Sequence, residues 1–285
     1  MKRYIAVDIG GTSIKYGIIN REGKLMSLKS IPTPDINCAD GVIKFLDELI
    51  ASLWNHEISG IGISTLGVVD EERGMVVGAC DNFPGLLGLG LKEKLKRRFR
   101  VSVSVMNDVN AAALGEAYFG AGKGLDTFYC ITLGTGIGGA FIIQKKIHQG
   151  ANGMAGEVGY LWKMPAEQGY EEKASMKAFL KASATDLDGI EVLQKVIDND
   201  EKFLEYFNQW VQIVAQGIKD IIYILDPGTI IIGGGVSARG TFLTDRIQQV
   251  LEDIIVDEFK NKTKVLPATH SNMSNLLGAI TPFLR

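Results

Sequence analysis

The chain has 285 residues, 46% of them hydrophobic and 22% charged, which is enough to build two compact lobes. Its formal net charge of −3 gives no support to a nucleic-acid partner, which would require clustered basic residues. The three cysteines, Cys38, Cys80 and Cys130, form no CxxC pair, so neither a disulfide framework nor a cysteine zinc site is indicated. Because no apolar stretch suits a signal peptide or a membrane span, we expect a cytoplasmic protein without a membrane partner.

The first 120 residues alternate short apolar strands with amphipathic helices. Strands are predicted at residues 4–9, 15–20, 25–30, 60–64 and 101–106, the last from a strict alternation of valine and serine. Helices are predicted at residues 41–54, where apolar residues recur at helical spacing, and 109–119.

The second half of the chain repeats this order. Strands are predicted at residues 127–133, 140–144 and 229–232, and helices at 201–225, 243–259 and 272–283. Residues 165–200 are polar and show only some helical character. Residues 7–20 and 132–144 share the order strand, glycine turn, strand, which predicts two lobes of one topology. We place the lobes at 1–120 and 121–271, with a hinge near 120–124 and a last helix (272–285) packed on the first lobe.

The first glycine turn has the sequence DIGGT at residues 8–12. Asp8 ends a buried strand, Gly10 and Gly11 let backbone N–H groups approach an anion, and Thr12 adds a hydroxyl donor. The carboxylate suits Mg²⁺ or its waters rather than phosphate itself. A plain β-hairpin turn with an exposed aspartate is the alternative, and this motif alone does not decide between them.

Two further glycine turns lie in the second half. GTGIGG at 134–139 has the spacing of a dinucleotide fingerprint, but that fingerprint must open a helix, and residues 140–144 read as a strand. GGG at 233–235 follows a strand and precedes a helix, a geometry that suits a nucleotide. The P-loop pattern GxxxxGK[ST] is absent from the sequence. Three glycine turns spread over two lobes therefore predict a nucleotide held between the lobes.

One acidic residue stands where open α/β sheets place their chemistry. Asp108 follows the alternating strand and Asn107, and a helix begins directly after it. It can act as the general base that phosphoryl transfer requires of its acceptor hydroxyl. It can equally serve as the N-cap of the helix. The two roles are compatible.

Together these motifs resemble the ROK family, which groups bacterial sugar kinases with sugar-responsive repressors. The resemblance rests on DIGGT with Lys15, on NDVNAAALGE at 107–116, on GTGIGG at 134–139 and on GANGMAGEVG at 150–159. It runs in order from Asp8 to about Gly278. It implies an α/β fold of two actin-like (ribonuclease H-like) lobes with ATP and sugar in the cleft between them, Mg²⁺ as cofactor and a homodimeric assembly.

The resemblance also implies roles for individual residues. Asp108 would activate a sugar hydroxyl, the 6-hydroxyl of a hexose, as the catalytic base. The sugar-binding residues by motif match are Gly67, Asn82, Asn107, Asp108, Glu157 and Tyr160. The residues for nucleotide and phosphate are Asp8, Gly10, Gly11, Thr12, Lys15, Thr135, Gly136, Gly233 and Gly234. Asp8 would hold Mg²⁺ through water.

The chain departs from the family pattern in one region. Many members continue from the glutamate segment with Gly-His and a cysteine-rich zinc motif, whereas here Tyr160 follows Gly159 and residues 162–175 contain no cysteine or histidine. We therefore expect no structural zinc. The zinc-less pattern resembles the β-glucoside kinases, which phosphorylate disaccharides such as cellobiose. Glucokinase, fructokinase and N-acetylmannosamine kinase remain alternatives, as does a non-catalytic sugar sensor.

Two of the competing functions fit the sequence less well. Only seven residues precede Asp8, so we expect no N-terminal DNA-binding module of the kind that the family's repressors carry. A pure sugar-binding protein would need no phosphate cradle, yet the chain has Asp108 and all three glycine turns. The sequence thus predicts an ATP-dependent kinase whose partner is a small-molecule sugar.

Overall fold

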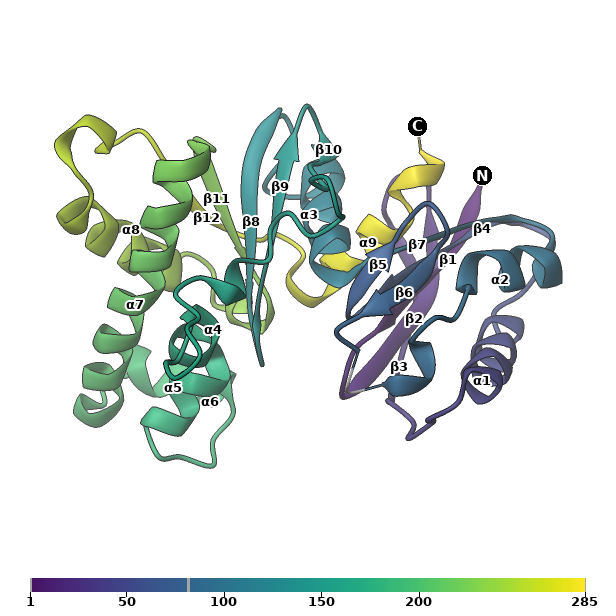
Figure 1. The fold of residues 1–285 in the computed structure, drawn as a ribbon, viewed down its shortest axis with the longest axis horizontal. Coiled ribbons are helices and arrows are strands. Elements are labelled where there is room, and N and C mark those ends of the chain that lie inside the picture. Colours follow the sequence, from purple (N-terminus) through teal and green to yellow (C-terminus); the bar gives the residue numbers. More distant parts are fainter. Residues whose placement is uncertain (1, 81–82, 285) are drawn as a thin grey trace. The chain divides into compact units, whose positions relative to one another are not determined.

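The computed structural model describes residues 2–80 and 83–284, which form two compact units (Figure 1). The first unit comprises residues 1–119, 150–154 and 273–285, and the second comprises residues 120–149 and 155–272. Each unit is built on its own five-stranded sheet with its own hydrophobic core.

The sheet of the first unit has the order β3-β2-β1-β4-β7. Its strands are β1 (Arg3–Ile9), β2 (Ser13–Asn20), β3 (Leu25–Pro32), β4 (Ile58–Thr65) and β7 (Ser102–Asn107). The first three form an antiparallel meander, and β4 and β7 continue the sheet parallel to β1. The carboxyl ends of β1, β4 and β7 consequently lie at one edge, and this edge positions the candidate site.

Side chains on the two faces of this sheet differ in size. One face carries mainly Ile and Val and packs against α1 (Ala39–Ala51) and α2 (Leu91–Phe99). The other face carries small residues on β4 and β7, and α9 (Ser274–Ala279) approaches it so closely that a Cβ on Gly62 would lie 2.3 Å from the carbonyl oxygen of Ala279. Beside α9 lies α3 (Asp108–Phe119), which leaves the end of β7. The small residues thus let the two helices sit against the strand ends.

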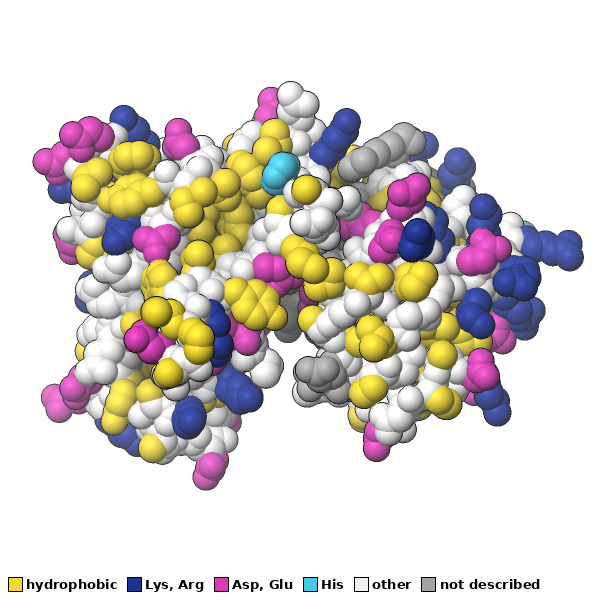
Figure 2. Space-filling view, in the orientation of Figure 1, with side chains coloured by type: hydrophobic (Ala, Val, Ile, Leu, Met, Phe, Trp, Pro, Cys, Tyr) yellow, Lys and Arg dark blue, Asp and Glu magenta, His cyan; other side chains and the backbone are white. Residues whose placement is uncertain are grey.

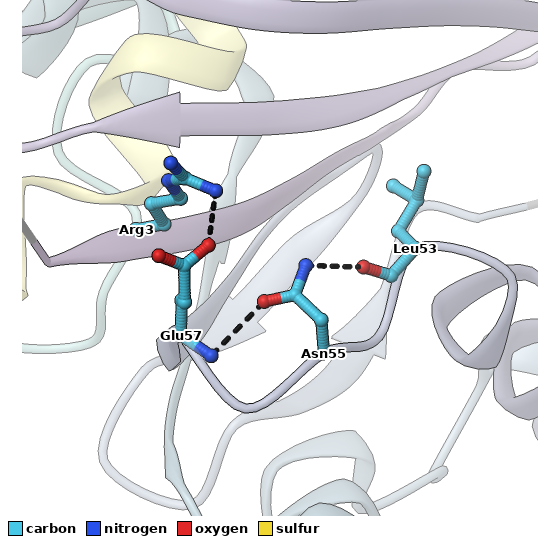
Figure 3. A network of polar contacts seen from close by, with 4 residues as sticks. All are labelled: Arg3, Leu53, Asn55 and Glu57. Atoms are coloured by element: carbon cyan, nitrogen blue, oxygen red, sulfur yellow. Dashed lines mark hydrogen bonds and ion pairs between the residues drawn. The ribbon is translucent and has the colours of Figure 1, made fainter.

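The loop that leads into β4 is fixed to the start of β1 (Figure 3). The Arg3 guanidinium donates to the Glu57 carboxylate in an ion pair. The backbone N–H of Glu57 donates to Asn55 Oδ1 at 3.0 Å. Arg3 pairs with Ile58 in the parallel sheet, and the register shifts by a bulge between Arg3 and Tyr4.

The sheet of the second unit repeats the order of the first. Its strands are β8 (Thr127–Leu133), β9 (Ile137–Ile143), β10 (Lys146–Ile147), β11 (Thr229–Gly233) and β12 (Lys264–Pro267), in the order β10-β9-β8-β11-β12. As in the first unit, an antiparallel meander is extended by two parallel strands. The prediction of two lobes with one topology is therefore confirmed.

The helices of the second unit fill the connection between β10 and β11 and the one after β11. They are α4 (Tyr170–Ala174), α5 (Met176–Ala182), α6 (Gly189–Ile197), α7 (Glu201–Leu225) and α8 (Phe242–Ile254). The long helix α7 buries Trp210, Val214, Ile218 and Ile222 in the core of this unit. Short 3₁₀ turns lie at Val158–Tyr160 and Gly235–Arg239.

The predicted elements exist, with corrections at several ends. Strand β9 begins at Ile137 rather than at residue 140, because the glycine turn needs only residues 134–136. Helix α8 ends at Ile254 rather than at 259, since Ile255 has an extended backbone. The last helix is shorter than predicted, because the segments on both sides of α9, Ser271–Met273 and Thr281–Phe283, form 3₁₀ turns.

The elements that the sequence did not reveal are short or highly charged. They are β5 (Val68–Asp70), β6 (Met75–Gly78), α2, β10, β12 and α4 to α6. Residues 91–100 contain six Lys and Arg, and this charge made the helical spacing of the three buried apolar residues of α2 hard to recognise in the sequence. Figure 2 shows these basic side chains gathered over α2. No helix within the described residues has the length and apolarity needed to cross a membrane.

Candidate active site

Asp8 lies at the carboxyl end of β1 and is almost fully buried. Its Oδ1 accepts hydrogen bonds from Ser64 Oγ of β4 at 2.7 Å and from Asn275 Nδ2 of α9 at 3.1 Å. Burial raises the pKa of this carboxyl, while these two donors and the charge of Lys15 act in the opposite direction. Among the described residues, Oδ2 accepts no hydrogen bond. A buried carboxylate with one oxygen that accepts no hydrogen bond from the described residues suits a cation or its water shell.

The turn that follows Asp8 presents backbone rather than side chains. Gly11 and Thr12 are exposed, and the turn is closed by the N–H of Gly10, which donates to the Ser13 carbonyl at 3.1 Å. The Thr33 hydroxyl of the neighbouring loop donates to the Gly10 carbonyl at 2.6 Å. Lys15 pairs with Asp8 across β1 and β2. The geometry is that of a rigid turn able to receive an anion.

Asn107, at the end of β7, caps helix α3. Its Oδ1 accepts the N–H groups of Val109 at 2.9 Å and Asn110 at 3.1 Å, and its Nδ2 donates to the Gly67 carbonyl at 2.9 Å. Asp108 is the first residue of the helix, and its Oδ1 accepts the N–H of Val109 at 2.9 Å. The helix start is therefore capped by Asn107, and Asp108 offers a second acceptor to the Val109 N–H.

Gly67 forms the turn between β4 and β5 in a conformation that side chains rarely adopt. Its φ is +90°, and a Cβ here would lie 2.6 Å from the Gly78 carbonyl oxygen. Since Thr65 pairs with Asn107 in the parallel register of β4 and β7, this turn lies beside Asp108. The sequence-predicted Asn82 lies outside the described residues.

In the second unit, the turn between β8 and β9 is fixed by a carboxylate. Gly134 donates its N–H to the Gly136 carbonyl at 3.0 Å, and Glu171 Oε2 accepts the N–H of Ile137 at 2.8 Å. Gly136 leaves room for Glu171, since a Cβ there would lie 2.5 Å from Glu171 Oε2. Thr135 is exposed at the tip of the turn.

A pocket of about 460 Å³ opens beside this turn. Leu133, Met176, Leu180, Ile190 and Val236 give it apolar walls, and Thr135, Lys177, Asp188 and Gly235 add polar atoms or backbone. Gly233 and Gly234 lead into it from β11. Gly234 has φ +88°, and a Cβ there would lie 2.4 Å from the Leu133 carbonyl oxygen, so both its conformation and its surroundings require glycine. A pocket of this volume with flat glycine edges suits a planar ring carrying polar groups.

Glu157 and Tyr160 lie on a short segment that packs against β9. Both side chains are exposed, Tyr160 by 66%. Partial burial and, to a smaller extent, the negative charge of Glu171 raise the pKa of Glu157. A Cβ on Gly159 would lie 2.8 Å from the Ile137 carbonyl oxygen and 3.3 Å from Glu171 Oε2. The structure thus places Glu157, Glu171 and the 134–136 turn together within one unit.

Sequence reasoning missed Glu171 and the walls of the pocket. Met176, Leu180, Asp188 and Ile190 all come from residues 165–200, which the sequence left uninterpreted. Two local signals were present for the helices there, because Ser175 caps α5 and Asp188 forms a capping box with Glu191. Nothing local marks Glu171, because its contacts depend on the fold.

No group of three or more His, Cys, Asp or Glu side chains is arranged to hold a metal ion in the described part of the chain. Mg²⁺ in phosphotransferases is held mainly by water and phosphate oxygens with one or two carboxylates. The single buried carboxylate of Asp8 beside an exposed glycine turn fits that pattern.

Comparison with known proteins gives consistent matches over the whole chain. The family model described as "ROK family" matches residues 4–284. A β-glucoside kinase from Listeria innocua is 30% identical over 304 residues, which cover 98% of this chain and 97% of that protein.

Solved structures agree with the sequence matches. The crystal structure of a ROK family glucokinase from Streptomyces griseus in complex with glucose and AMPPNP has a TM-score of 0.86 at 31% identity, covering 98% of both chains. A ROK family protein from Streptococcus pneumoniae in complex with sucrose has a TM-score of 0.86 at 29% identity, covering 99% of this chain and 98% of that one.

The two five-stranded sheets and their glycine turns define a sugar kinase with the actin-like α/β fold. The chain belongs to the ROK family. The sequence-based predictions of fold class and enzyme class are therefore confirmed.

Proposed function

We propose that the chain transfers a phosphoryl group from ATP to a hydroxyl of a hexose or a β-glucoside, with Asp108 as general base. The observation that carries this proposal is that Asp108 begins α3 directly after the carboxyl end of β7, where open α/β sheets place their chemistry, while Asn107 caps the helix. Asp108 would accept the proton of the attacking hydroxyl, the 6-hydroxyl of the sugar, while the rest of the site positions and neutralises charge.

The remaining residues divide between sugar and nucleotide. We assign the sugar to Gly67, Asn82, Asn107, Glu157 and Tyr160. We assign phosphate and nucleotide to Asp8, Gly10, Gly11, Thr12, Lys15, Thr135, Gly136, Gly233 and Gly234. The pocket beside Thr135 and Gly235 would take the nucleoside, and Mg²⁺ would neutralise the phosphates close to Asp8. The first unit would thus hold most of the sugar and phosphate contacts, and the second would hold the nucleoside and contribute Glu157 and Tyr160 to the sugar.

A coupled assay of ADP formation over a panel of sugars tests the function. We expect sugar-dependent turnover that requires ATP and Mg²⁺. Turnover that no sugar in the panel stimulates would contradict the proposal and would favour a non-catalytic sugar sensor. Light scattering of the same preparation would test the homodimer that the family resemblance supports.

Within that panel we expect a β-linked disaccharide such as cellobiose or gentiobiose to show a higher kcat/KM than glucose. Tyr160 replaces the family's histidine, and its exposed ring could stack on a second sugar. The Listeria innocua relative is a β-glucoside kinase, and the Streptococcus pneumoniae structure holds a disaccharide. Tyr160→His should reduce the preference. If kcat/KM for glucose, fructose or N-acetylmannosamine exceeds that for the disaccharide by tenfold or more, the β-glucoside assignment is wrong. The assignment as a sugar kinase would still hold.

Purified protein should contain no stoichiometric zinc. Residues 162–175 lack the cysteine and histidine ligands of a structural site. The segment is held instead by aromatic side chains, since Tyr170 Oη donates to the Val214 carbonyl at 2.9 Å and Trp210 Nε1 to the Ala174 carbonyl at 2.8 Å. Elemental analysis finding about one zinc per chain would overturn this. EDTA should still abolish turnover by removing Mg²⁺ from ATP.

Glu171→Gln should shift the acid limb of kcat/KM for the sugar to lower pH. Glu157 binds sugar hydroxyls best when ionised, and its pKa is raised in part by the charge of Glu171. Removing that charge lowers the pKa of Glu157, so protonation and the loss of sugar binding occur at more acid pH. The glutamine keeps an oxygen that can accept the Ile137 N–H.

The matched control for this change is Glu172→Gln in the same helix. Glu172 accepts the N–H of Gly169 at 3.0 Å and pairs with Lys163, away from Glu157. Its substitution should leave the acid limb in place. If the acid limb of kcat/KM in Glu171→Gln is unchanged, or shifts to higher pH, ionisation of Glu157 does not determine that limb.

A further inference from the structure

The segment that carries Glu157 and Tyr160 spans a pocket in the second unit. This pocket of about 300 Å³ lies between segment 155–161 and the last turns of α7, where Ile221, Ile224 and Leu225 form one wall. Side chains do not fill the space beneath the segment, so close packing there cannot fix its position. The segment is therefore held by its contact with β9 at Gly159 and by its two ends.

The first end is fixed by backbone contacts. Tyr129 Oη donates to the Gly156 carbonyl at 3.1 Å. The chains at Gly139 and Gly156 approach so closely that a Cβ on Gly156 would lie 2.4 Å from the Gly139 carbonyl oxygen. These contacts fix the residue directly before Glu157.

The second end is fixed through Trp162. Its indole Nε1 donates to Asp220 Oδ2 on α7 at 2.8 Å, and its ring meets that of Tyr170 edge-on, with ring centroids 5.0 Å apart. The preceding carbonyl, that of Leu161, accepts the N–H of Tyr170 at 2.7 Å. Hydrogen bonds to a carboxylate are stronger than those between neutral groups.

The backbone of Trp162 is strained. Its φ is +61°, in the left-handed region that a bulky residue adopts only when its surroundings enforce it. A glycine would adopt this φ without strain. A tryptophan at such a position indicates that the contacts of the indole outweigh the backbone strain.

We propose that Trp162 is a positioning residue for sugar binding, whose hydrogen bond to Asp220 fixes segment 155–161, and with it Glu157 and Tyr160, against α7. Trp162 acts through these two residues and has no contact with the sugar. The inference rests on the proposed sugar-binding roles of Glu157 and Tyr160.

Kinetics of Trp162→Phe, Asp220→Ala and the double variant test this proposal. Each single change removes the same hydrogen bond, so we expect KM for the sugar to rise about five- to tenfold in each, with kcat and KM for ATP within about twofold of wild type. The double variant should be no worse than either single one, since both act on one contact. Asp220→Asn keeps an oxygen acceptor and should restore KM to near the wild-type value.

Trp162→Gly separates positioning from a role in the turn alone. If Trp162 only formed a turn, glycine would relieve the strained φ and raise the thermal unfolding midpoint. KM for the sugar would then stay unchanged, and that result would overturn the proposal. We expect KM to rise while AMPPNP binding, measured by calorimetry, persists. A wild-type protein without sugar-dependent turnover would contradict the proposed function itself. If the wild type is active but KM for the sugar is unchanged in Trp162→Phe and Asp220→Ala, only this inference is overturned.

Discussion

Asp108→Asn should lower kcat by at least ~10²-fold, the usual scale for losing a general base. The asparagine keeps an Oδ1 that can accept the N–H of Val109, and Asn107 continues to cap α3. The free energy of unfolding should therefore change little, and AMPPNP binding, measured by calorimetry, should stay close to that of the wild type. The loss should appear in kcat, because proton removal occurs in the chemical step.

The matched control is the same exchange at another helix start. Asp200 precedes α7 and makes no side-chain capping hydrogen bond, so Asp200→Asn removes a carboxylate at a helix N-terminus without touching the site. It should leave kcat unchanged. If Asp108→Asn retained most of its turnover and lost stability instead, Asp108 would be chiefly a helix-start residue and another group would have to accept the proton.

The parts of the site that could be predicted from sequence are those made by neighbours along the chain. The DIGGT turn and the Asn107-Asp108 pair each combine a strand end, a turn and polar side chains within a few residues, and the structure has them as expected. The sequence did not reveal that the Asn107 side chain accepts both N–H groups at the start of α3. The role of Asp108 as base stays a prediction.

Contacts between distant segments escaped the sequence for a physical reason. Asn275 donates to Asp8 across 267 residues, and no periodicity or motif reports such a pair. Helices α4 to α6 are short, and the contacts that place them are tertiary: Tyr170 buries its ring against Gly217 of α7, where a Cβ would lie 2.3 Å from Cζ. The nucleotide pocket walls and Glu171 depend on these helices, so they became visible only in the structure.

Gly278→Ala should destabilise the first unit strongly, because α9 and α3 touch backbone to backbone at this position. A Cβ on Gly278 would lie 1.7 Å from the Ala111 carbonyl oxygen and 2.4 Å from its carbon, and neither atom belongs to a side chain that can rotate away. Alanine gains about 0.5–1 kcal/mol over glycine within a helix. Overpacking a tight contact costs about 1–3 kcal/mol or more, and here two helices must separate, so the loss should exceed the gain.

A shift of α9 away from α3 should also disturb the site. Asn275 of α9 donates a hydrogen bond to Asp8, and Ser274 Oγ of α9 donates to the buried Glu116 of α3 at 2.6 Å. We therefore expect the midpoint of urea unfolding to fall and the turnover of the folded fraction to fall with it. Gly78→Ala is the control, since nothing lies within 4 Å of a Cβ there, and its unfolding midpoint should stay near that of the wild type. A Gly278→Ala protein as stable as this control would show that α3 and α9 can accommodate a methyl group between them. The small residues on β4, β7 and α9 would then not determine how closely the helices pack.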